Sequence, residues 1–568
     1  MPDSPAAGAA NGRPVQGYRA VPEYRESFMG HGFGHPRWSV RGGSAARVPV
    51  PPVAPCRCWI SLAGALLGAL VLAGCASVGP DFHAPPAPAV SGYLHGVVPA
   101  TTGAAAQITP SQQLVAVSTI SPGWWTGYRS RTLDDLIDRA LKNNQSLAAT
   151  EAALRQARET YAAQSDSTRY PTVNGSLGAS RNRVPGATSG QPRSEERTYN
   201  LYSVGIDVAY NFDLFGGNRR ALEALAAQAD YQAFQLAGAR LALAGTVVAA
   251  AVTQAELGEQ IAATQTIVKA QEDQLAIARK RFALHAVSRV EVLTLRTQLE
   301  QTRATLPPLR NRLQQTDHLL AVLIGQAPGD ADIPRFTLAD FTLPPELPLV
   351  VPSNLVRQRP DIRAATALLH AATAQYGVAV SALYPQIDLS ARVATEALTT
   401  SALFGPGSTA WTLAGQLAQP LFNAGLKAGA RAAEARMQGA GATYRDTVLQ
   451  ALRQVADVLR QLDNDAQALD AQRVAARSSR ESFHLIRQQY RLGAASYLQL
   501  LTAEEQVQQA RVALIAARAA RLADSAALYQ AMGGGVLATA EETGNAAAVR
   551  TASPSNAPSG ATHDQGHD

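Results

Sequence analysis

Four short segments of the chain alternate between apolar and polar residues. In residues 202–212, the even-numbered positions are Tyr, Val, Ile, Val, Tyr and Phe, and the odd-numbered positions are Ser, Gly, Asp, Ala and Asn. Residues 386–393 and 411–418 repeat the alternation, and residues 173–179 follow it more weakly. A period of two over about 9–11 residues is typical of a membrane-barrel strand, with lipid on one side and a lumen on the other. A half-buried sheet in a soluble protein alternates in the same way.

Two much longer segments predict helices. Residues 218–284 and 426–492 each span 67 residues without a proline, which corresponds to roughly 100 Å of helix. In the second segment, apolar residues recur at alternating steps of four and three, at Val448, Leu452, Val455, Leu459, Leu462, Ala466 and Leu469. This 3.5-residue period predicts supercoiled neighbouring helices. A plain antiparallel coiled-coil rod explains the helices equally well, but it does not explain the strands.

The sequence is a tandem duplication. Residues 281–288 align with residues 489–496, and matching positions keep a constant offset of 208 over the stretch 217–325. Each copy predicts two strands, a short Phe/Gly turn, a long helix and a returning helix, preceded by a helical stretch that ends near Tyr-Pro (residues 132–164 and 361–382). We expect the glycine of each turn to adopt a positive φ where the strand changes to a helix.

A short apolar segment lies near the start of the chain. Residues 59–74 contain no charge, follow Arg57, and end in Leu-Ala-Gly before Cys75. Sixteen residues are too few to span a bilayer comfortably, whereas a basic flank, a short apolar run and small residues predict a secretory signal. The ending resembles the bacterial lipobox, in which the cysteine is acylated and becomes the mature N-terminus. Cys75 is therefore the expected lipidation site; the alternative is an apolar helix that happens to contain a cysteine.

The surroundings of this segment add two expectations. The stretch 1–58 that precedes it is long for the basic part of a signal, which indicates a later start codon such as Met29. No other apolar run approaches the length of about 18 residues that marks a membrane helix, so the sequence predicts no transmembrane helix, and a membrane crossing would require strands. About eight strands are needed to close even a filled barrel. Four strands per chain therefore imply an oligomer, and three chains would supply twelve.

Composition and charge exclude several functional classes. The 568-residue chain has a net charge of +6, but +4 of this belongs to positions 1–74, so the charge does not indicate a nucleic-acid partner. Three cysteines exclude a disulfide scaffold. The sequence contains no HExxH, Walker or G-x-S-x-G motif and no paired-cysteine metal site. We therefore expect no enzyme, no metal and no cofactor, apart from a covalent lipid on Cys75.

The signal, the repeats and the shifts in composition divide the chain into six parts. They are a leader with a lipoprotein signal, in which a later start codon is expected (1–74), a lipidated N-terminal linker (75–131), a first repeat (132–327), a linker (328–352), a second repeat (353–535) and a tail rich in Ala, Thr, Ser, Gly and Pro that is expected to be disordered (536–568).

Several motifs carry a family resemblance. Residues 78–82 (Val-Gly-Pro-Asp-Phe), 359–364 (Arg-Pro-Asp-Ile-Arg-Ala) and 528–535, together with Trp124-Trp125, resemble motifs of the outer membrane factor family, the TolC-like efflux lipoproteins of the NodT group. The likeness covers residues 75–535. It implies a mostly α fold with a small β part: a trimeric outer-membrane β-barrel with four strands per chain, continued by a long periplasmic α-helical barrel.

The resemblance also implies function and partners. An outer membrane factor is the outer-membrane channel of a tripartite efflux pump, and it receives substrates from an inner-membrane pump through a periplasmic adaptor, the membrane fusion protein. The alternative is that the chain is itself a periplasmic coiled-coil adaptor or a structural lipoprotein. An adaptor has one helical hairpin, however, whereas this sequence predicts two hairpins and four amphipathic strands.

Two groups of site residues follow from the resemblance. Leu284 and His285 in the first copy, and Leu492 and Gly493 in the second, are the expected hairpin tips that contact the adaptor. His285 departs from the glycine expected where a chain reverses, which puts equal use of both tips in doubt.

A gate is expected just after the second tip, because three copies of one residue around an axis form a constriction. Residues 497–502 resemble the gate stretch of the family, with Leu498 as the apolar gate and Thr502 where the family commonly has Asp. Glu504 or Glu505 would then supply any preference for cations. The alternative is that Leu498 is a heptad core residue.

Overall fold

The computed structural model describes residues 77–88, 90, 92–94, 101–102, 111–184 and 197–535. All of them belong to one unit, which spans residues 68–568. Cys75, the leader and the tail from residue 536 lie outside the described residues.

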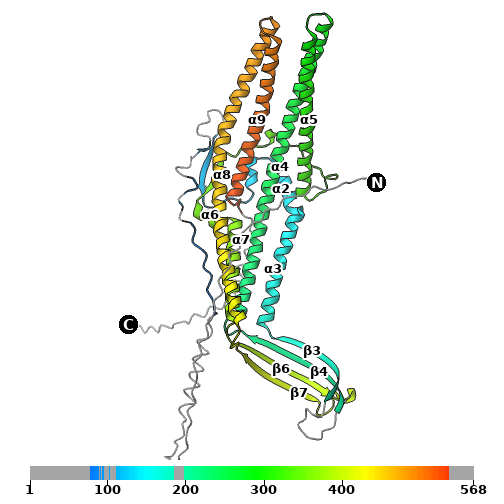
Figure 1. Cartoon of the computed structure of the whole chain (residues 1–568), viewed down its shortest axis with the longest axis vertical. Coiled ribbons are helices and arrows are strands. Elements are labelled where there is room, and N and C mark those ends of the chain that lie inside the picture. Colours follow the sequence, from blue (N-terminus) through cyan, green and yellow to red (C-terminus); the bar gives the residue numbers. More distant parts are fainter. Residues whose placement is uncertain are drawn as a thin grey trace, which may run out of the picture. The chain divides into compact units, whose positions relative to one another are not determined.

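Two long helical hairpins dominate the described chain (Figure 1). Helix α4 (Gly217–Ala283) has 67 residues and helix α8 (Ala424–Arg491) has 68, so both predicted helices are confirmed to within two residues at each end. Helices α5 (Arg289–Leu323) and α9 (Tyr497–Ala531) return from them. The shorter helices are α2 (Arg131–Asn143), α3 (Gln145–Arg169), α6 (Pro352–Gln358) and α7 (Pro360–Ser381), with one-turn helices η1 (Trp124–Tyr128), η3 (Leu338–Asp340) and η4 (Thr400–Ala402).

The four predicted strands form one antiparallel sheet. Its members are β3 (Thr172–Val184), β4 (Arg197–Phe212), β6 (Gln386–Ala397) and β7 (Thr409–Ala418), in the order β3-β4-β6-β7. The pairing is continuous without a bulge, because each strand pair keeps one register along its whole length. The two strands from each repeat therefore join into a single sheet.

The change from helix to strand occurs at Tyr-Pro in both repeats. Tyr170 ends α3 in an extended conformation (φ −110°, ψ 146°), and β3 begins two residues later. Strand β6 begins directly after Pro385. A residue before proline is disfavoured in the helical region, so the dipeptide itself ends α3. In the second repeat α7 already ends at Ser381, and the dipeptide marks the start of β6.

The return from strand to helix differs between the repeats. Gly216 caps α4 with a φ of 77°. In the second repeat the cap is Asn423, whose side chain accepts hydrogen bonds from the N–H groups of Gly425 and Leu426, and Gly425 has no positive φ. The expectation of a positive-φ glycine is therefore wrong for the second repeat, because a side-chain cap starts the helix there.

A second, smaller sheet joins the two predicted linkers. Strand β2 (Gln112–Val117) pairs with β1 (Thr101–Thr102) on one side and runs parallel to β5 (Glu346–Val350) on the other. The side chain of Gln112 donates to the carbonyl of Pro344 at 2.8 Å. This sheet was not expected from the sequence, since parallel partners in two separate linkers leave no local pattern.

The core lies between the long helices and η1. Tyr128 is fully buried and donates a hydrogen bond to the carbonyl of Leu522 on α9 at 2.8 Å, and Trp124 stacks on Tyr529. Six of the seven predicted heptad residues of α8 are buried, and Leu452 is partly buried. The 3.5-residue pattern therefore marks the face of α8 that packs against the rest of the chain.

The Arg-Pro-Asp motif connects the start of one helix with the end of another. Pro360 is the first residue of α7, where its missing N–H has no helical partner to lose. Arg359 is buried, pairs with Asp361 at 2.9 Å, and donates to the carbonyl of Ala531 at the end of α9 at 2.8 Å. The motif therefore fixes the start of α7 to the end of α9.

Helix α4 contains a stretch that is long and apolar enough to cross a membrane by composition. It was not expected from the sequence. Half of that stretch is buried inside the chain, where α4 packs against α3, α5, α7 and α9. This burial is typical of the core helix of a helical assembly.

Candidate functional site

The four-stranded sheet has one apolar face. The register places Val393 beside Ile206 on one side and Trp411 on the other, and the same alignment holds along the strands. The large side chains of this face are open to solvent: Leu177 is 83% exposed, and Trp411 and Leu413 are both 75% exposed. In the part of the chain that the structure describes, no segment shields them.

The opposite face of the sheet is polar and internally paired. Asp207 accepts a hydrogen bond from the Ser176 hydroxyl at 3.1 Å and lies 3.6 Å from the Arg392 guanidinium. The Asn211 amide donates to Asp388 at 2.8 Å. These cross-strand contacts link β3, β4 and β6 through charged and amide groups, as on a water-facing surface.

The exposure of the apolar face separates the two interpretations of the alternating strands. A half-buried sheet of a soluble protein packs its apolar face onto a core, whereas this face is uncovered. Large exposed apolar patches mark contact with lipid or with another protein. The outer edges of β3 and β7 are also without a partner among the described strands. The arrangement differs from that of a half-buried sheet that packs onto a core of its own chain.

Both hairpin tips have the same backbone structure. Two hydrogen bonds close each turn, from His285 to Phe282 and from Ala286 to Arg281 in the first, and from Gly493 to Tyr490 and from Ala494 to Gln489 in the second. His285 has a φ of 56° and Gly493 a φ of 78°, so both occupy the left-handed region. Histidine is among the residues that tolerate this region better than most. The departure at His285 therefore leaves the turn unchanged.

The apolar residues at the two tips are also alike. Leu284 is 78% exposed and Leu492 is 83% exposed. Each long hairpin therefore ends in an apolar side chain that no described segment covers.

The first two turns of α9 present two of the expected gate residues to solvent. Leu498 is 69% exposed, whereas Leu500 and Ala503 are buried. The interpretation of Leu498 as a heptad core residue is therefore wrong within this chain. Thr502 is exposed, and its hydroxyl donates to the carbonyl of Leu498 at 3.0 Å. The two side chains share one face of α9.

The two neighbouring glutamates of α9 have different surroundings. Glu504 is buried and accepts a hydrogen bond from the Gln274 amide of α4 at 2.7 Å. Burial raises the pKa of its carboxyl, and the hydrogen bond from Gln274 opposes this rise in part. Glu505 is exposed. Of the two, only Glu505 presents its charge to solvent in this chain.

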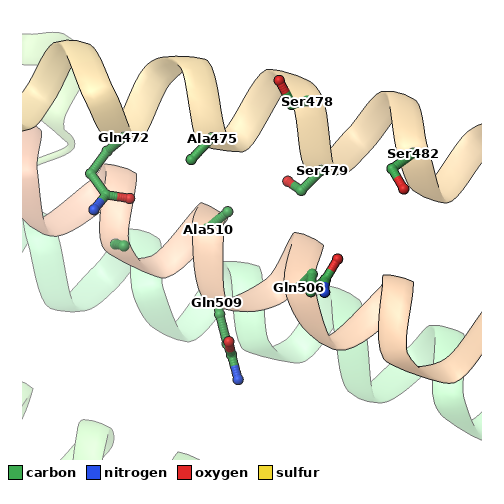
Figure 2. Close-up of a pocket in the computed structure, with 9 residues that line it drawn as sticks. Gln472, Ala475, Ser478, Ser479, Ser482, Gln506, Gln509 and Ala510 are labelled. Carbon is green, nitrogen blue, oxygen red and sulfur yellow. The ribbon is translucent and has the colours of Figure 1, made fainter.

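A groove of about 470 Å³ separates α8 and α9 farther from the tip. Figure 2 shows the residues of α8 and α9 that line it. The labelled residues are Gln472, Ala475, Ser478, Ser479 and Ser482 from α8, and Gln506, Gln509 and Ala510 from α9. The lining contains no acid, base or aromatic ring, so the groove offers a packing surface and no catalytic group.

Residues 77–82 are docked beside the start of α4. Arg220 of α4 is buried, and its guanidinium pairs with Asp81 at 2.6 Å and with Glu223 at 2.7 Å. The same guanidinium donates to the carbonyls of Val78 at 3.3 Å and Gly79 at 3.4 Å. One arginine therefore holds four groups, three of which belong to the docked segment.

Helix α7 forms the other side of this docking site. A Cβ at Gly79, which has a φ of 91°, would lie 2.7 Å from the Cα of Gly377, so only glycine fits at this approach. Phe82 stacks on His370 with ring centroids 4.3 Å apart, and His370 pairs with Glu223 at 2.8 Å. The Val-Gly-Pro-Asp-Phe motif is thus a docking segment.

Among the described residues, no group of three or more His, Cys, Asp and Glu side chains is placed to hold a metal ion.

A family model described as outer membrane efflux protein matches residues 136–326 and 351–534, which together make up most of the chain. The chain belongs to the outer membrane efflux protein family. Each match covers one of the two repeats, with the helices and strands described above.

This outer membrane efflux protein has relatives of similar extent. It is 31% identical over 475 residues to the outer membrane protein OprJ of Pseudomonas aeruginosa, which covers 83% of this chain and 95% of OprJ. It is 29% identical over 471 residues to the toluene efflux pump outer membrane protein TtgI of Pseudomonas putida, and the match covers 82% of this chain and 96% of TtgI. The probable outer membrane lipoprotein SilC of Salmonella typhimurium is 28% identical over 479 residues, covering 82% and 96%.

Solved structures show the same fold. The outer-membrane channel OprN superposes with a TM-score of 0.72 at 25% identity, covering 81% of this chain and 99% of that chain. The Campylobacter jejuni CmeC outer membrane channel superposes with a TM-score of 0.74 at 20% identity. The superposition covers 83% of this chain and 98% of the CmeC chain. The mostly helical architecture with a minor sheet is therefore that of outer-membrane channels.

The docking motif could be named from the sequence, but its binding partners could not. Arg220 lies 141 residues from Gly79, and His370 is farther still. No local pattern distinguishes a buried arginine from an exposed one. The signal that could have indicated the site was Gly377, a glycine inside a predicted helix, which often has a packing reason.

Proposed function

We propose that this outer membrane efflux protein forms the outer-membrane duct of a tripartite efflux pump. Substrates would pass through it from an inner-membrane transporter and a periplasmic adaptor to the exterior. The observation that carries this proposal is the four-stranded sheet, with an exposed apolar face, a polar opposite face and two open edges, joined directly to helices of about 100 Å. Strands of this kind suit an outer membrane, and helices of this length suit a periplasm.

The duct is a homotrimer in this proposal. Four strands cannot enclose a lumen, and three chains supply twelve. Because β3-β4-β6-β7 are all antiparallel neighbours, β3 and β7 run in opposite directions. Pairing β7 of one chain with β3 of the next would close the barrel in an antiparallel pattern and remove every open edge.

Lipid on Cys75 would add a second attachment to the outer membrane. Cys75 precedes the docked segment by two residues, so a lipid there would be tethered close to Ser77. Replacing Cys75 by Ser should abolish labelling with a radioactive fatty acid while the strands still insert. Membrane-bound protein that retains residues before Cys75 would contradict the assignment.

The tips and the start of α9 would carry the partner contact and the gate. Leu284, His285, Leu492 and Gly493 lie at the ends of the hairpins and would meet the adaptor. Leu498 would form an apolar constriction when three copies surround the axis. Thr502 is uncharged, so any preference for cations would come from Glu505.

Charge substitution on the two faces of one strand tests the proposal. Leu413 belongs to the apolar face of β7 and Thr412 to the polar face. Leu413→Arg should prevent insertion, because a lipid-facing arginine near mid-membrane costs about 2–4 kcal/mol in each chain, whereas Thr412→Arg should insert. Outer-membrane fractionation, heat-stable trimer bands and conductance in planar bilayers provide the readout.

The same experiment distinguishes an outer-membrane channel from the alternative, a periplasmic adaptor or structural lipoprotein. A periplasmic adaptor or structural lipoprotein would give no conductance in planar bilayers, and both variants would fractionate alike. That result would overturn the channel assignment.

A further inference from the structure

The two strands that lead into the long helices have different lengths at their ends. Ala209 of β4 pairs with the first residue of β3, and Ala418 of β7 pairs with the first residue of β6, so the two alanines are equivalent. Strand β4 continues for three more residues, to Phe212, because β6 pairs with it on the other side. Strand β7 ends at Ala418, and no described strand lies on its other side. The end of β7 therefore lacks the second neighbour that lengthens β4.

The backbone after β7 suits a neighbour on the open side. The Glu396 N–H donates to the carbonyl of Ser408 at 2.8 Å, so Ser408 directs its backbone groups toward β6. Successive residues of a strand alternate in this direction. A continuation of β7 would therefore turn Pro420, which has no N–H, toward β6, and its missing donor explains why that pairing stops. The N–H groups of Gln419 and Leu421 would point to the open side.

The turn into each long helix carries a phenylalanine directly before the helix cap. In the first repeat it is Phe215, which stacks on Tyr384 of the second repeat with ring centroids 4.9 Å apart. In the second repeat it is Phe422, which is 92% exposed and follows Leu421, which is 94% exposed. Tyr170, the equivalent of Tyr384, is 57% exposed and precedes β3 at the opposite edge of the sheet. Both members of a second aromatic pair are thus present, and they are exposed at the two open edges.

The initial segments of the long helices show the same difference. Ala224 and Ala227 of α4 are buried, whereas their equivalents on α8, Ala432 and Ala435, are exposed. Helix α7 packs against α8 of its own repeat and against α4 of the other repeat. Its equivalent α3 packs closely against α4 of its own repeat. The exposed alanines of α8 therefore mark the position where α3 of a second copy would pack.

We propose that Leu421 and Phe422 anchor the interface between two copies of this chain, by packing on Val173 and Tyr170 of the second copy. The inference rests on the homotrimer of the proposed function, and it identifies the contact that joins one chain to the next. Each contact between the first and second repeats within a chain is repeated between the second repeat of one chain and the first repeat of the next.

The pairing of β4 with β6 gives the register of this interface. Phe212 lies opposite Ile387, the second residue of β6. Leu421 is the equivalent of Phe212, since each follows its equivalent alanine by three residues, and it lies opposite Val173, the second residue of β3. Val173 is 62% exposed in the single chain. The interface therefore covers apolar side chains and satisfies backbone groups on both open edges.

Disulfide trapping in the full-length protein tests the register. Ala414 of one copy lies opposite Ser180 of the next, in a pair whose Cα atoms are about 4.5 Å apart, within the range of a disulfide. A414C/S180C should therefore form disulfide-linked dimers and trimers on a denaturing gel without reductant. In the matched control, A414C/S176C, the second cysteine is displaced by four residues, or about 14 Å, and should not be linked. A link within one chain is excluded, because three strand spacings, or about 14 Å, separate β7 from β3.

Substitution of the anchor tests its contribution to assembly. F422S should increase the monomer fraction at least about tenfold over the wild type, because each chain then loses the burial of a large apolar side chain. Phe404, in the connection between β6 and β7, is also exposed, at 78%, and lies outside the proposed contact, so F404S is the matched control. F404S should form trimers like the wild type. A wild-type monomer fraction in F422S, or an equal loss of trimer in F404S, would overturn the anchor.

Conductance in planar bilayers distinguishes failure of this interface from failure of the proposed function. If the wild type forms trimers and conducts, but A414C/S180C gives no link or A414C/S176C gives one instead, the proposed interface is wrong and the duct stands. If the wild type neither forms trimers nor conducts, the proposed function itself is wrong.

Discussion

The α4/α5 and α8/α9 hairpins turn through the same hydrogen bonds but with different residues. His285 and Gly493 are equivalent by the offset of 208, and both take a left-handed φ. The serines that cap the returning helices, Ser288 and Ser496, are equivalent as well, and each accepts a hydrogen bond from an N–H three residues later. The duplication therefore preserved the backbone at the tips more strictly than the side chains.

Away from the tips the two hairpins differ in what they contact. Gln271 of α4 is buried, and Gln274 donates to Glu504 of α9. The equivalent residues of α8 are Ser479 and Ser482, which line the groove between α8 and α9. One copy of the unit uses these positions for contacts within the chain, and the other leaves them open. Equivalent sequence positions thus acquired different neighbours, and substitutions at matched positions can measure the difference.

The largest effect is expected at the start of the returning helices. Leu498 and Val290 are equivalent, and they are 69% and 71% exposed. If only the second repeat supplies the gate, Leu498→Ala should raise conductance several-fold in planar bilayers, because three side chains shorten at one level. Val290→Ala should change it little. An intact trimer in which Leu498→Ala conducts like the wild type would place the constriction elsewhere.

The next largest effect is expected where the long helices begin. Arg220 lies four residues after the cap of α4, and Lys427 lies four residues after the cap of α8, where it is exposed. Arg220→Met should cost about 2 kcal/mol through lost charged hydrogen bonds, and residues 77–82 should become accessible to protease. Lys427→Met should stay within about 0.5 kcal/mol of the wild type. Unchanged proteolysis of Arg220→Met would show that other contacts hold the segment.

A pH-dependent effect is expected at Asp524 in the second repeat. Asp524 is buried on α9, where burial and the neighbouring Asp465 raise its pKa to about 8, although the nearby Arg521 opposes this rise. Because the folded form keeps its proton where the unfolded form has lost it, stability should fall as pH rises from about 4 to 8. Asp524→Asn should reduce this fall, and the remainder should come from other carboxyls whose pKa is raised by burial, such as Glu256 and Glu504.

Asp317 provides the matched control for this measurement. It accepts a hydrogen bond from Gln254 at 2.7 Å, as Asp524 does from Gln461 at 2.7 Å. Thermal unfolding of Asp317→Asn over the same pH range measures what loss of a carboxylate in the same kind of hydrogen bond does by itself, together with loss of its ion pair with Arg335. A pH profile of Asp524→Asn that matches the wild type would assign the dependence to other groups.

The smallest effect is expected at the tips. Gly493→His should cost only about 1 kcal/mol locally, because His285 already occupies this backbone region. Hydrogen exchange of the tip amides measures the change, and His285→Gly should shift exchange in the opposite direction. A bulky, β-branched Gly493→Val should impair efflux without lowering the trimer yield. Normal drug resistance in that variant would argue against adaptor contact at this tip.

Regular elements could be predicted from the sequence because their signals are local. The alternation in residues 202–212 requires only that one side of a strand face lipid or a core, and the heptads of α8 require only one packed face. The Tyr-Pro boundaries follow from a clash between adjacent residues. The cap of α8 could not be predicted in the same way, because the side chain of Asn423 caps this helix where a glycine with positive φ was expected.

In the candidate site, too, features with a local signal could be predicted and features that depend on distant residues could not. The tips at His285 and Gly493 could be located from the duplication, because an equal offset places equivalent turns at equivalent positions. The surroundings of Glu504 and Glu505 could not be distinguished, although the two residues are adjacent. The partner that buries Glu504 is Gln274, 230 residues away.

The sequence by itself determined the lengths of the helices, the four amphipathic strands, the two repeats and the positions of the reversals. All of these depend on period and on steric restriction within a few residues. Only the tertiary structure decided which faces are covered: that the apolar side of the sheet is open, that Leu498 is exposed, that the linkers form a sheet, and that Arg220 holds residues 77–82. Burial and pairing depend on residues that are distant in the chain, and their proximity arises only when the helices pack.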